Sequence, residues 1–474
     1  MLDLLIKGGT VVTPFGVGQY DVGIKDGSIV FVSVPGAITD EAGRTIDATD
    51  KLVVPGGIDP HTHCAWPVMQ EKNGEPLFTG GPDQVSRAAL FGGTTMLVDF
   101  AVWQGQGTIQ EAIERHVNRW TGDSYTDFAF HIMLLGEVPG EVVGQLPEAI
   151  ADGHASVKMF TTDVTPSRRG RKVHYGTILE VLETLAANGG IAAIHAEDDD
   201  IVMHTYNRYI AEGTVAFPHL SEVHSTLSED LSFRRIIRLA ESIEGAALYM
   251  MHVSAASGVQ AIRESRANGY PIFGETLHQY AMFTQEDYKR TNGQIYHTYP
   301  SLKSEEDRLA LWRGMETDTI HTIGTDEICT PLEVKTMGER IDDTTGGNAG
   351  VEPRMGVVYS EGVGRRNYPL ERFVDLTSAN AAKVLGMYPQ KGAIAPGSDA
   401  DIAIFQTDLD YSLSIDQLHE TDYSPWEGTR IHGWPVTTIL RGKVVVDDGE
   451  FFGDTSDGKL VPRKLAQSVL EGRC

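Results

Sequence analysis

Six side chains of the types that bind metal ions stand at the ends of separate apolar runs. His61 and His63 are two residues apart, so on a β-strand both imidazoles point to one face and can meet one metal ion. The other four residues end or interrupt later runs: Lys158, His195, His252 and Asp326. A single histidine in such a place is usually structural, but six matching positions predict a metal centre. Imidazole and carboxylate ligands suit zinc, with manganese, iron or cobalt as alternatives.

Lys158 is the unusual member of this set. A protonated amine repels a cation and cannot bind it, whereas a desolvated, neutral lysine beside a metal can react with carbon dioxide. The resulting carbamate has two oxygens and can bridge two metal ions. The alternative is a buried lysine that forms an ion pair with a carboxylate.

The apolar runs alternate with helix-like stretches, which is the βα rhythm of a parallel sheet. Eight runs begin near Gly57, Thr95, Phe128, Ser156, Ile191, Ala247, Pro271 and Ile320. This number predicts an α/β fold, a (β/α)8 TIM barrel over residues 56–389. Barrel enzymes carry their chemistry at the C-terminal ends of the strands, where the six residues are expected to lie.

The two ends of the chain have a different texture. Residues 1–55 and 390–450 contain short strand-like runs separated by Gly and Asp turns, and we expect them to form one small β-sandwich together. Residues 451–474 are polar and rich in Gly and Asp. Two interpretations of this tail are open: a disordered terminus, or a tail that contacts a neighbouring subunit.

Composition excludes several classes of function. The 474 residues carry a formal net charge of -27, which disfavours binding to nucleic acids and to anionic membranes. Only three cysteines occur, no signal segment opens the chain, and no apolar run reaches the roughly 20 residues that span a bilayer. We therefore expect a cytoplasmic globular enzyme that binds neither nucleic acids nor membranes.

The metal-ligand residues lie in segments that resemble a known family. Pro55-Gly-Gly-Ile-Asp-Pro-His-Thr-His is similar to the metal-binding signature of the amidohydrolase superfamily. Further segments resemble its dihydropyrimidinase/hydantoinase branch: Leu90-Phe-Gly-Gly-Thr-Thr-Met, Ser156-Val-Lys-Met-Phe, Ile194-His-Ala-Glu, His252-Val-Ser, Gly274-Glu-Thr, Tyr359-Ser-Glu-Gly-Val, Leu376-Thr-Ser-Ala-Asn and Gly392-Ala-Ile-Ala-Pro-Gly-Ser-Asp-Ala-Asp. The matches extend from about residue 5 to residue 450.

This resemblance implies a binuclear zinc hydrolase that opens the C–N bond of a cyclic amide, such as a ureide, imide or lactam. It assigns His61, His63 and Asp326 to one metal, and His195 and His252 to the other. A carbamate on Lys158 and a hydroxide would bridge them. The hydroxide attacks the ring carbonyl, and Asp326 is the catalytic residue that moves its proton to the leaving nitrogen. The resemblance also implies a homo-oligomer, a tetramer or a dimer.

The residues expected around the substrate depart from the family pattern. The family places an oxyanion-binding tyrosine five residues after the lysine, where this chain has Asp163. Tyr299 replaces a substrate-binding serine, His278 replaces a proline, and Asn348 lies in an altered loop. These changes favour a hydrolase with an altered substrate pocket. Our hypothesis is that Tyr299, Tyr175 or His278 supplies the missing donor.

The loop Thr165-Pro-Ser-Arg-Arg-Gly-Arg-Lys is strongly basic for so acidic a protein. It is either a solvated loop or a contact for an anion or substrate near the mouth of the barrel.

Two further alternatives remain for the whole chain. One is a true D-hydantoinase or dihydropyrimidinase whose tyrosine has merely shifted. The other is a non-catalytic scaffold protein of the same fold, although such proteins usually lack the metal ligands.

Overall fold

The barrel is built from eight parallel strands. The computed structural model describes residues 1–38, 40–72 and 74–473. Its strands follow one another around the sheet in chain order: β6 (Gly57–Asp59), β9 (Thr94–Val102), β10 (Asp127–Met133), β11 (Ser156–Phe160), β12 (Ile191–His195), β13 (Ala247–Met250), β14 (Ile272–Leu277) and β15 (Thr322–Gly324). Each predicted apolar run contains one of these strands.

The segments that follow β6 and β15 meet and close the barrel. Thr325 donates its hydroxyl to Asp59 at 2.7 Å. Beyond it, the Glu327 amide donates to the His61 carbonyl at 3.2 Å, and the His63 amide donates to the Glu327 carbonyl at 3.0 Å. This closure confirms the predicted (β/α)8 barrel and brings the first and last strands together at their C-terminal ends.

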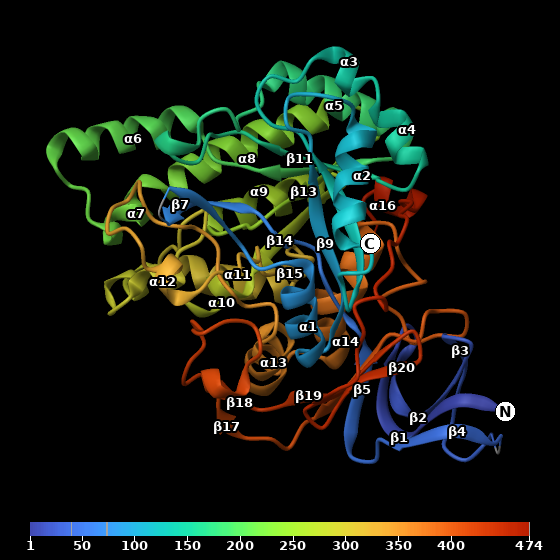
Figure 1. Cartoon of the computed structure of the whole chain (residues 1–474). Helices are drawn as coiled ribbons and strands as arrows, with labels where there is room; N and C mark the ends of the chain where they lie inside the picture. The colour runs from blue at the N-terminus through green and yellow to red at the C-terminus, as the bar shows by residue number, and fades with distance from the viewer. Residues whose placement is uncertain (39, 73, 474) are drawn as a thin grey trace.

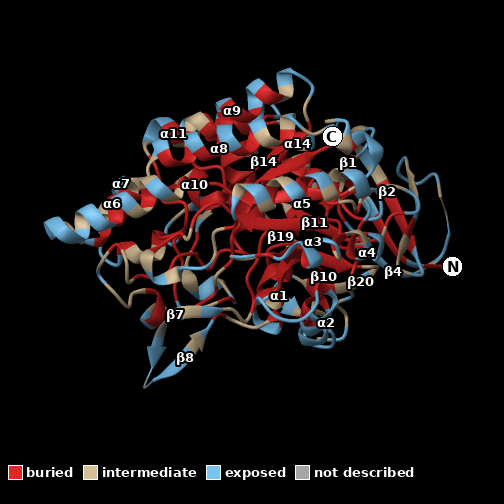
Figure 2. Ribbon diagram, turned by 90° about the horizontal axis from the view of Figure 1, so that it is seen from above, coloured by how far each residue is buried: buried red, intermediate tan, exposed pale blue. Residues whose placement is uncertain are grey.

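Helices surround the barrel, with their outer faces exposed and their inner faces buried (Figure 2). Their bounds are α1 (Pro82–Phe91), α2 (Ile109–Trp120), α3 (Gly140–Val143), α4 (Leu146–Ala151), α5 (Tyr175–Asn188), α6 (Asp199–Glu212), α7 (Leu220–Val223), α8 (Thr226–Glu241), α9 (Ala256–Ala267), α10 (His278–Met282), α11 (Glu305–Glu316), α12 (Leu332–Lys335), α13 (Arg354–Val358), α14 (Leu370–Val374), α15 (Asn380–Val384) and α16 (Gln467–Leu470). Local sequence explains several ends. Helix α2 begins with a capping box between Thr108 and Glu111, and α5 ends at Gly189 in the left-handed conformation.

A second sheet joins the two ends of the chain (Figure 1). Its strands are β1 (Leu2–Thr13), β2 (Gly16–Lys25), β3 (Ser28–Ser33), β4 (Ala42–Asp47), β5 (Lys51–Pro55), β16 (Ile402–Gln406), β19 (Trp434–Leu440), β20 (Lys443–Asp447) and β21 (Glu450–Phe451). Strand β5 pairs with β1 on one side and with β16 on the other, so early and late segments share one sheet. Buried aliphatic side chains from both ends pack together against it.

Lys391 links this sheet to the barrel through a buried ion-pair network. Its Nζ atom lies 2.5 Å from Asp127, the first residue of β10, and 2.6 Å from Asp401, beside β16. These carboxylates outweigh the effect of burial and raise the pKa of Lys391, so the ammonium stays charged. The network fixes the small sheet relative to the barrel.

The C-terminal segment, residues 451–473, packs on its own barrel. The Phe128 amide donates to the Lys459 carbonyl at 2.9 Å, and the Val461 amide donates to the Phe128 carbonyl at 2.8 Å. Val461, Leu465 and Val469 are buried. This packing corrects the disordered-terminus interpretation, because the spaced apolar residues anchor an otherwise polar segment. Contact of this tail with a neighbouring subunit stays a prediction.

A hairpin of β7 (Pro67–Lys72) and β8 (Glu75–Phe78) follows the first strand of the barrel and projects from the molecule (Figure 2). The sequence analysis did not predict it. None of the helices within the described ranges is long and apolar enough to cross a bilayer.

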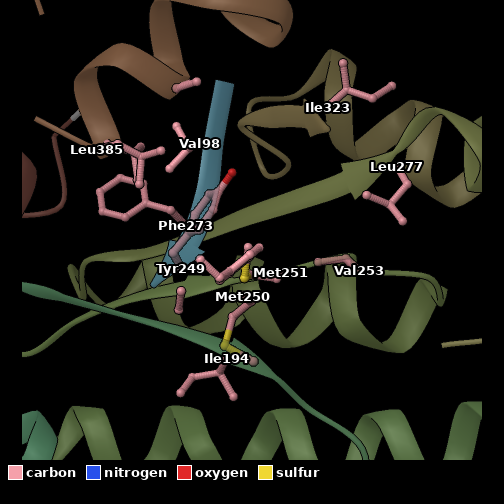
Figure 3. Packing of buried hydrophobic residues seen from close by; sticks show 14 of the residues in the cluster. Val98, Ile194, Tyr249, Met250, Met251, Val253, Phe273, Leu277, Ile323 and Leu385 are labelled. Carbon is pink, nitrogen blue, oxygen red and sulfur yellow. The ribbon is translucent and has the colours of Figure 1, made fainter. Parts of the chain in front are cut away.

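The floor beneath the strand ends is a close-packed apolar core. Side chains of neighbouring strands meet there, including Val98, Ile194, Tyr249 and Phe273 (Figure 3). Burying one such side chain contributes on the order of 1.5–3 kcal/mol to stability. The residues that rise from these strands are therefore held on a rigid base.

Candidate metal centre and substrate pocket

His61, His63 and Asp326 converge where the barrel closes. One carboxylate oxygen of Asp326 lies 3.1 Å from His61 Nε2 and 3.0 Å from His63 Nε2. One ligand atom from each residue lies within 4.8 Å of the others, and all three side chains are buried. This cluster can bind a metal ion.

His195 and His252 lie beside this cluster at the ends of β12 and β13. Their ring centroids are 4.4 Å apart, and the His252 ring is 5.5 Å from that of His61. The five candidate ligands thus form one continuous group, as the sequence analysis predicted from their places at the strand ends.

Backbone strain marks two of these residues. His252 has φ of 40° and Asp326 has φ of 50°, a left-handed conformation that residues other than glycine seldom adopt. Such conformations cost on the order of 1–3 kcal/mol and persist only where the surrounding structure imposes them. The fold therefore turns both side chains toward the group at the expense of stability.

Lys158 is buried in β11, and its environment suits a neutral amine. Its Nζ atom lies 3.0 Å from the sulfur of Met251 and 4.9 Å from the centre of the Phe160 ring. Burial lowers the pKa of Lys158 to about 8, against the opposing effects of Asp326 and Glu275. Among the described residues no carboxylate lies within 4.0 Å of the amine. The ion-paired alternative is therefore not what the structure contains.

Two buried carboxylates orient the histidines from behind. Glu275 lies 2.9 Å from His61 Nδ1 and accepts a hydrogen bond from the Tyr249 hydroxyl at 2.9 Å. Glu197 lies 2.9 Å from His195 Nε2 and 2.8 Å from His224 Nδ1. Such partners fix the ring orientation and increase the basicity of a histidine ligand.

The charges in the group fit divalent cations. Asp326 and Glu275 overcome the effect of burial and raise the pKa of His61 to about 9, whereas burial lowers the pKa of His63 and of His195 to about 4. Although burial opposes it, the adjacent His61 holds the pKa of Asp326 well below its ordinary value. Zinc binds neutral imidazoles and an ionised carboxylate, so His63, His195 and Asp326 already have the form that binds, whereas His61 would have to release a proton to the bound metal.

The Glu275→Gln substitution tests this supporting role. Glutamine keeps the shape but loses the charge that faces His61, so we expect zinc affinity to fall roughly 10- to 100-fold. Competition with a chromogenic chelator measures the affinity. Glu264→Gln on the exposed face of α9 is the control. If the Glu275 variant binds zinc with unchanged affinity, the Glu275 carboxylate does not support the metal site.

A pocket opens above these residues, with an empty volume of about 640 Å³. It is lined by the six candidate ligands together with Trp66, Pro67, Val68, Phe160, Val164, Arg168, Arg171, Tyr299, Ile328, Thr345, Gly346 and Gly347. Pro67 and Val68 begin the unpredicted hairpin and Trp66 directly precedes it, so this segment forms one wall.

Tyr299 is the predicted substrate residue that lines this pocket. Its hydroxyl is buried beside that of Tyr206 and makes no hydrogen bond within 3.5 Å to a residue that the structure describes. Burial raises the pKa of Tyr299 to about 12, so the hydroxyl keeps its proton and can donate it to a ligand.

Asp163 and Tyr175 were expected at the substrate but do not line the pocket. The Asp163 carboxylate accepts hydrogen bonds from the backbone amides of Gly170, Arg171 and Lys172 at 2.9–3.0 Å. Tyr175 begins helix α5, where its hydroxyl accepts from Arg235. The backbone donors hold the Asp163 carboxylate away from the pocket, so its role is to order the basic loop.

His278 and Asn348 are also absent from the pocket wall. His278 stacks on Trp426 with a centroid distance of 4.1 Å, and its Nε2 atom lies 2.9 Å from the Gly350 carbonyl. With its amide nitrogen turned toward them, Asn348 lies 2.6–3.1 Å from the carbonyl oxygens of His297, Gly347 and Ile295. Both side chains satisfy buried backbone groups, which corrects the expectation that they contact the substrate.

Comparison with known proteins identifies the family. The amidohydrolase family model matches residues 52–445, most of the chain. The chain belongs to the amidohydrolase family.

Whole-chain relatives of this amidohydrolase include the D-hydantoinase of Geobacillus stearothermophilus. The two are 33% identical, over 97% of this chain and 96% of the relative. A crystal structure of D-hydantoinase and that of the dihydropyrimidinase from Brevibacillus agri each give a TM-score of 0.91 at 30% identity. Both cover 98% of this chain, and the matches extend over 99% and 100% of those chains.

These similarities include the barrel, the small sheet and the tail. This amidohydrolase is similar along nearly its whole length to D-hydantoinases and to a dihydropyrimidinase. The resemblance expected from its motifs is thereby confirmed. The relatives support a true hydantoinase or dihydropyrimidinase better than they support an altered pocket.

Proposed function

We propose that this chain opens the ring of a cyclic ureide, a hydantoin or a dihydropyrimidine, at a binuclear zinc centre. The observation that carries the proposal is the convergence of three buried groups at one pocket: His61, His63 and Asp326, the His195–His252 pair, and the unpaired amine of Lys158. Whole-chain similarity to hydantoinases supports the same activity.

The proposed ligand assignment follows this arrangement. His61, His63 and Asp326 would hold one zinc ion, and His195 and His252 the other, with a carbamate on Lys158 between them. When bound, the metal ions polarise the ring carbonyl and supply hydroxide near neutral pH. Manganese, iron or cobalt can replace zinc at such ligands.

Asp326 is placed to move the proton that hydrolysis requires. Its second carboxylate oxygen accepts from the Thr298 hydroxyl at 3.3 Å, which fixes the carboxylate plane. As a base, Asp326 takes the proton of the attacking water. As an acid, it then delivers that proton to the ring nitrogen when the C–N bond breaks.

Tyr299 is our candidate for the donor that stabilises the developing oxyanion. The Tyr299→Phe substitution should lower kcat by roughly tenfold or more, about 1.4 kcal/mol, because the donated hydrogen bond strengthens as charge develops. Steady-state kinetics on a hydantoin measures the effect. Tyr175→Phe, which removes a hydroxyl outside the pocket, should leave kcat unchanged. Equal kcat values for both variants would refute the assignment.

A substrate screen tests the proposed activity. The zinc-loaded protein, supplied with bicarbonate, is incubated with dihydrouracil, 5-substituted hydantoins, cyclic imides and lactams, and ring opening is followed. Turnover of the ureides supports the proposal. If only imides or lactams are opened, the altered-pocket alternative is correct. If no ring opens with metal bound, the non-catalytic scaffold is correct.

We further propose a homo-oligomer, a tetramer or a dimer, that works in the cytoplasm. Cys64 and Cys329 are free and buried, consistent with a reducing compartment. Analytical ultracentrifugation measures the assembly.

A further inference from the structure

Two arginines reach the substrate pocket from the basic loop between β11 and α5. The guanidinium of Arg168 lies 5.7 Å from the centre of the Tyr299 ring. That of Arg171 lies 6.0 Å from the centre of the Phe160 ring, whose face is also near Lys158. Both arginines therefore belong to the pocket that holds the candidate metal ligands.

Neither guanidinium forms a direct ion pair with a described residue, although the charge of Asp163 acts on Arg171 from farther away. Among the described residues no carboxylate lies within 4.0 Å of Arg168 or Arg171, whereas Asp326 in the same pocket is paired with His61 and His63. Asp326 is the carboxylate that lines the pocket, and it faces His61 and His63. Two positive charges in the same wall thus lack a direct ion pair in a protein whose formal net charge is -27, and Asp163 only partly offsets the charge of Arg171.

The loop that carries the arginines is held in place by its own chain. Asp163 accepts three backbone amide hydrogens from residues 170–172, and the Arg171 carbonyl accepts from the Gly136 amide at 3.2 Å. Lys172 forms an ion pair with Asp199 at 2.9 Å. The arginines are therefore presented from a fixed loop, whereas a solvated loop would leave them free to turn outward.

Burial, together with repulsion from Arg168, lowers the pKa of Arg171 to about 9. Holding two like charges together in a partly desolvated wall is unfavourable unless an anion binds between or beside them. A carboxylate matches the planar guanidinium and accepts charge-assisted hydrogen bonds from it. The missing partner is thus an anionic group of the ligand.

We infer that Arg168 and Arg171 form an anion subsite that selects cyclic ureides bearing a carboxylate on the ring substituent. This inference rests on the proposed ureide hydrolysis. In the reaction, water adds its oxygen to the ring carbonyl carbon, the C–N bond breaks, and the nitrogen gains a proton. The product then carries the new carboxylate in addition to the original one.

A matched pair of substrates tests the inference. Hydantoin carrying a carboxymethyl group at C5 is compared with the carbamoylmethyl analogue, which has nearly the same shape but no charge. Wild-type kcat/KM should favour the carboxylate by roughly tenfold or more. In Arg168→Gln and Arg171→Gln, this preference should shrink about tenfold each, through a higher KM for the carboxylate. The kcat/KM of these variants for the neutral carbamoylmethyl analogue should change little.

Arg169→Gln is the control, because Arg169 is exposed on the same loop and does not line the pocket. This substitution removes an equal charge and should leave kcat/KM for both substrates unchanged. If the wild type turns over the amide at least as well as the carboxylate, the anion subsite is wrong. It is also wrong if the Arg168 and Arg171 variants lose kcat/KM equally on both substrates. Absence of turnover on both substrates and on unsubstituted hydantoin instead overturns the proposed function.

Discussion

The Lys158→Met variant is expected to lose about half of its bound zinc and to fall in kcat by roughly a thousandfold or more. Losing one of two metal ions removes several kcal/mol of transition-state stabilisation, which corresponds to a change of this size. Methionine keeps the buried volume next to Met251 and Phe160, so the barrel should fold normally. Metal analysis of the purified chain and steady-state kinetics on a hydantoin measure the two effects.

The Lys158→Arg variant tests whether the site needs a carbamate at residue 158 or only a positive charge there. Arginine preserves the positive charge but stays protonated and cannot form a carbamate. It should therefore be as inactive as the methionine variant. If the arginine variant keeps both zinc ions and most of its activity, the lysine serves only as a buried cation and the bridging role is wrong.

The Asp326→Asn variant should lose roughly 100- to 10,000-fold in kcat, since an amide can neither take up nor deliver the proton. Its NH2 group would also face the Nε2 atoms of His61 and His63, where the carboxylate oxygen now lies at 3.1 and 3.0 Å. We expect KM to change less than kcat. Kinetics on a hydantoin, with circular dichroism to verify folding, provides the measurement.

Loss of folding in this variant would leave the kinetic result without meaning, so Asp326→Glu provides the control. Glutamate keeps the charge but moves it by one methylene, and it should bind metal while losing part of the activity. Full activity in the asparagine variant would show that another group carries the proton.

The barrel and the ligand group were predictable because both follow from local patterns. Apolar runs specify the eight strands, and the strand ends of a parallel barrel meet at one face. Residues such as His195 and His252 therefore come together although 57 positions separate them in the sequence. The left-handed backbone of His252 and Asp326 was not predictable, because it is imposed by the packing around them.

Side-chain direction explains the failures around the substrate. Asp163, His278 and Asn348 were expected near the substrate, yet each lies outside the pocket wall and turns toward backbone groups that would otherwise be unsatisfied. Tyr299 turns into the pocket instead. A sequence gives the position of such residues in a loop but not the hydrogen bonds that decide between the two directions.

The positions of Glu275 and Glu197 in the sequence indicate their supporting role, but the sequence analysis did not use them for this purpose. Glu275 lies inside the apolar strand β14, and Glu197 lies two residues after the end of β12. A carboxylate in such a place is costly to bury and needs a partner, so it predicts a contact with a nearby histidine or metal ligand. Both residues are fully buried and make that contact.

The most direct test of the account is a zinc titration of the metal-free protein in bicarbonate, with hydantoin ring opening measured at each step. If two metal ions are held by the six ligand residues, activity should rise until two zinc ions are bound per chain and then stay constant. The ligands in question are His61, His63, His195, His252, Asp326 and a carbamate on Lys158. Full activity at one zinc ion per chain, or no ring opening at any zinc content, would contradict the binuclear hydrolase.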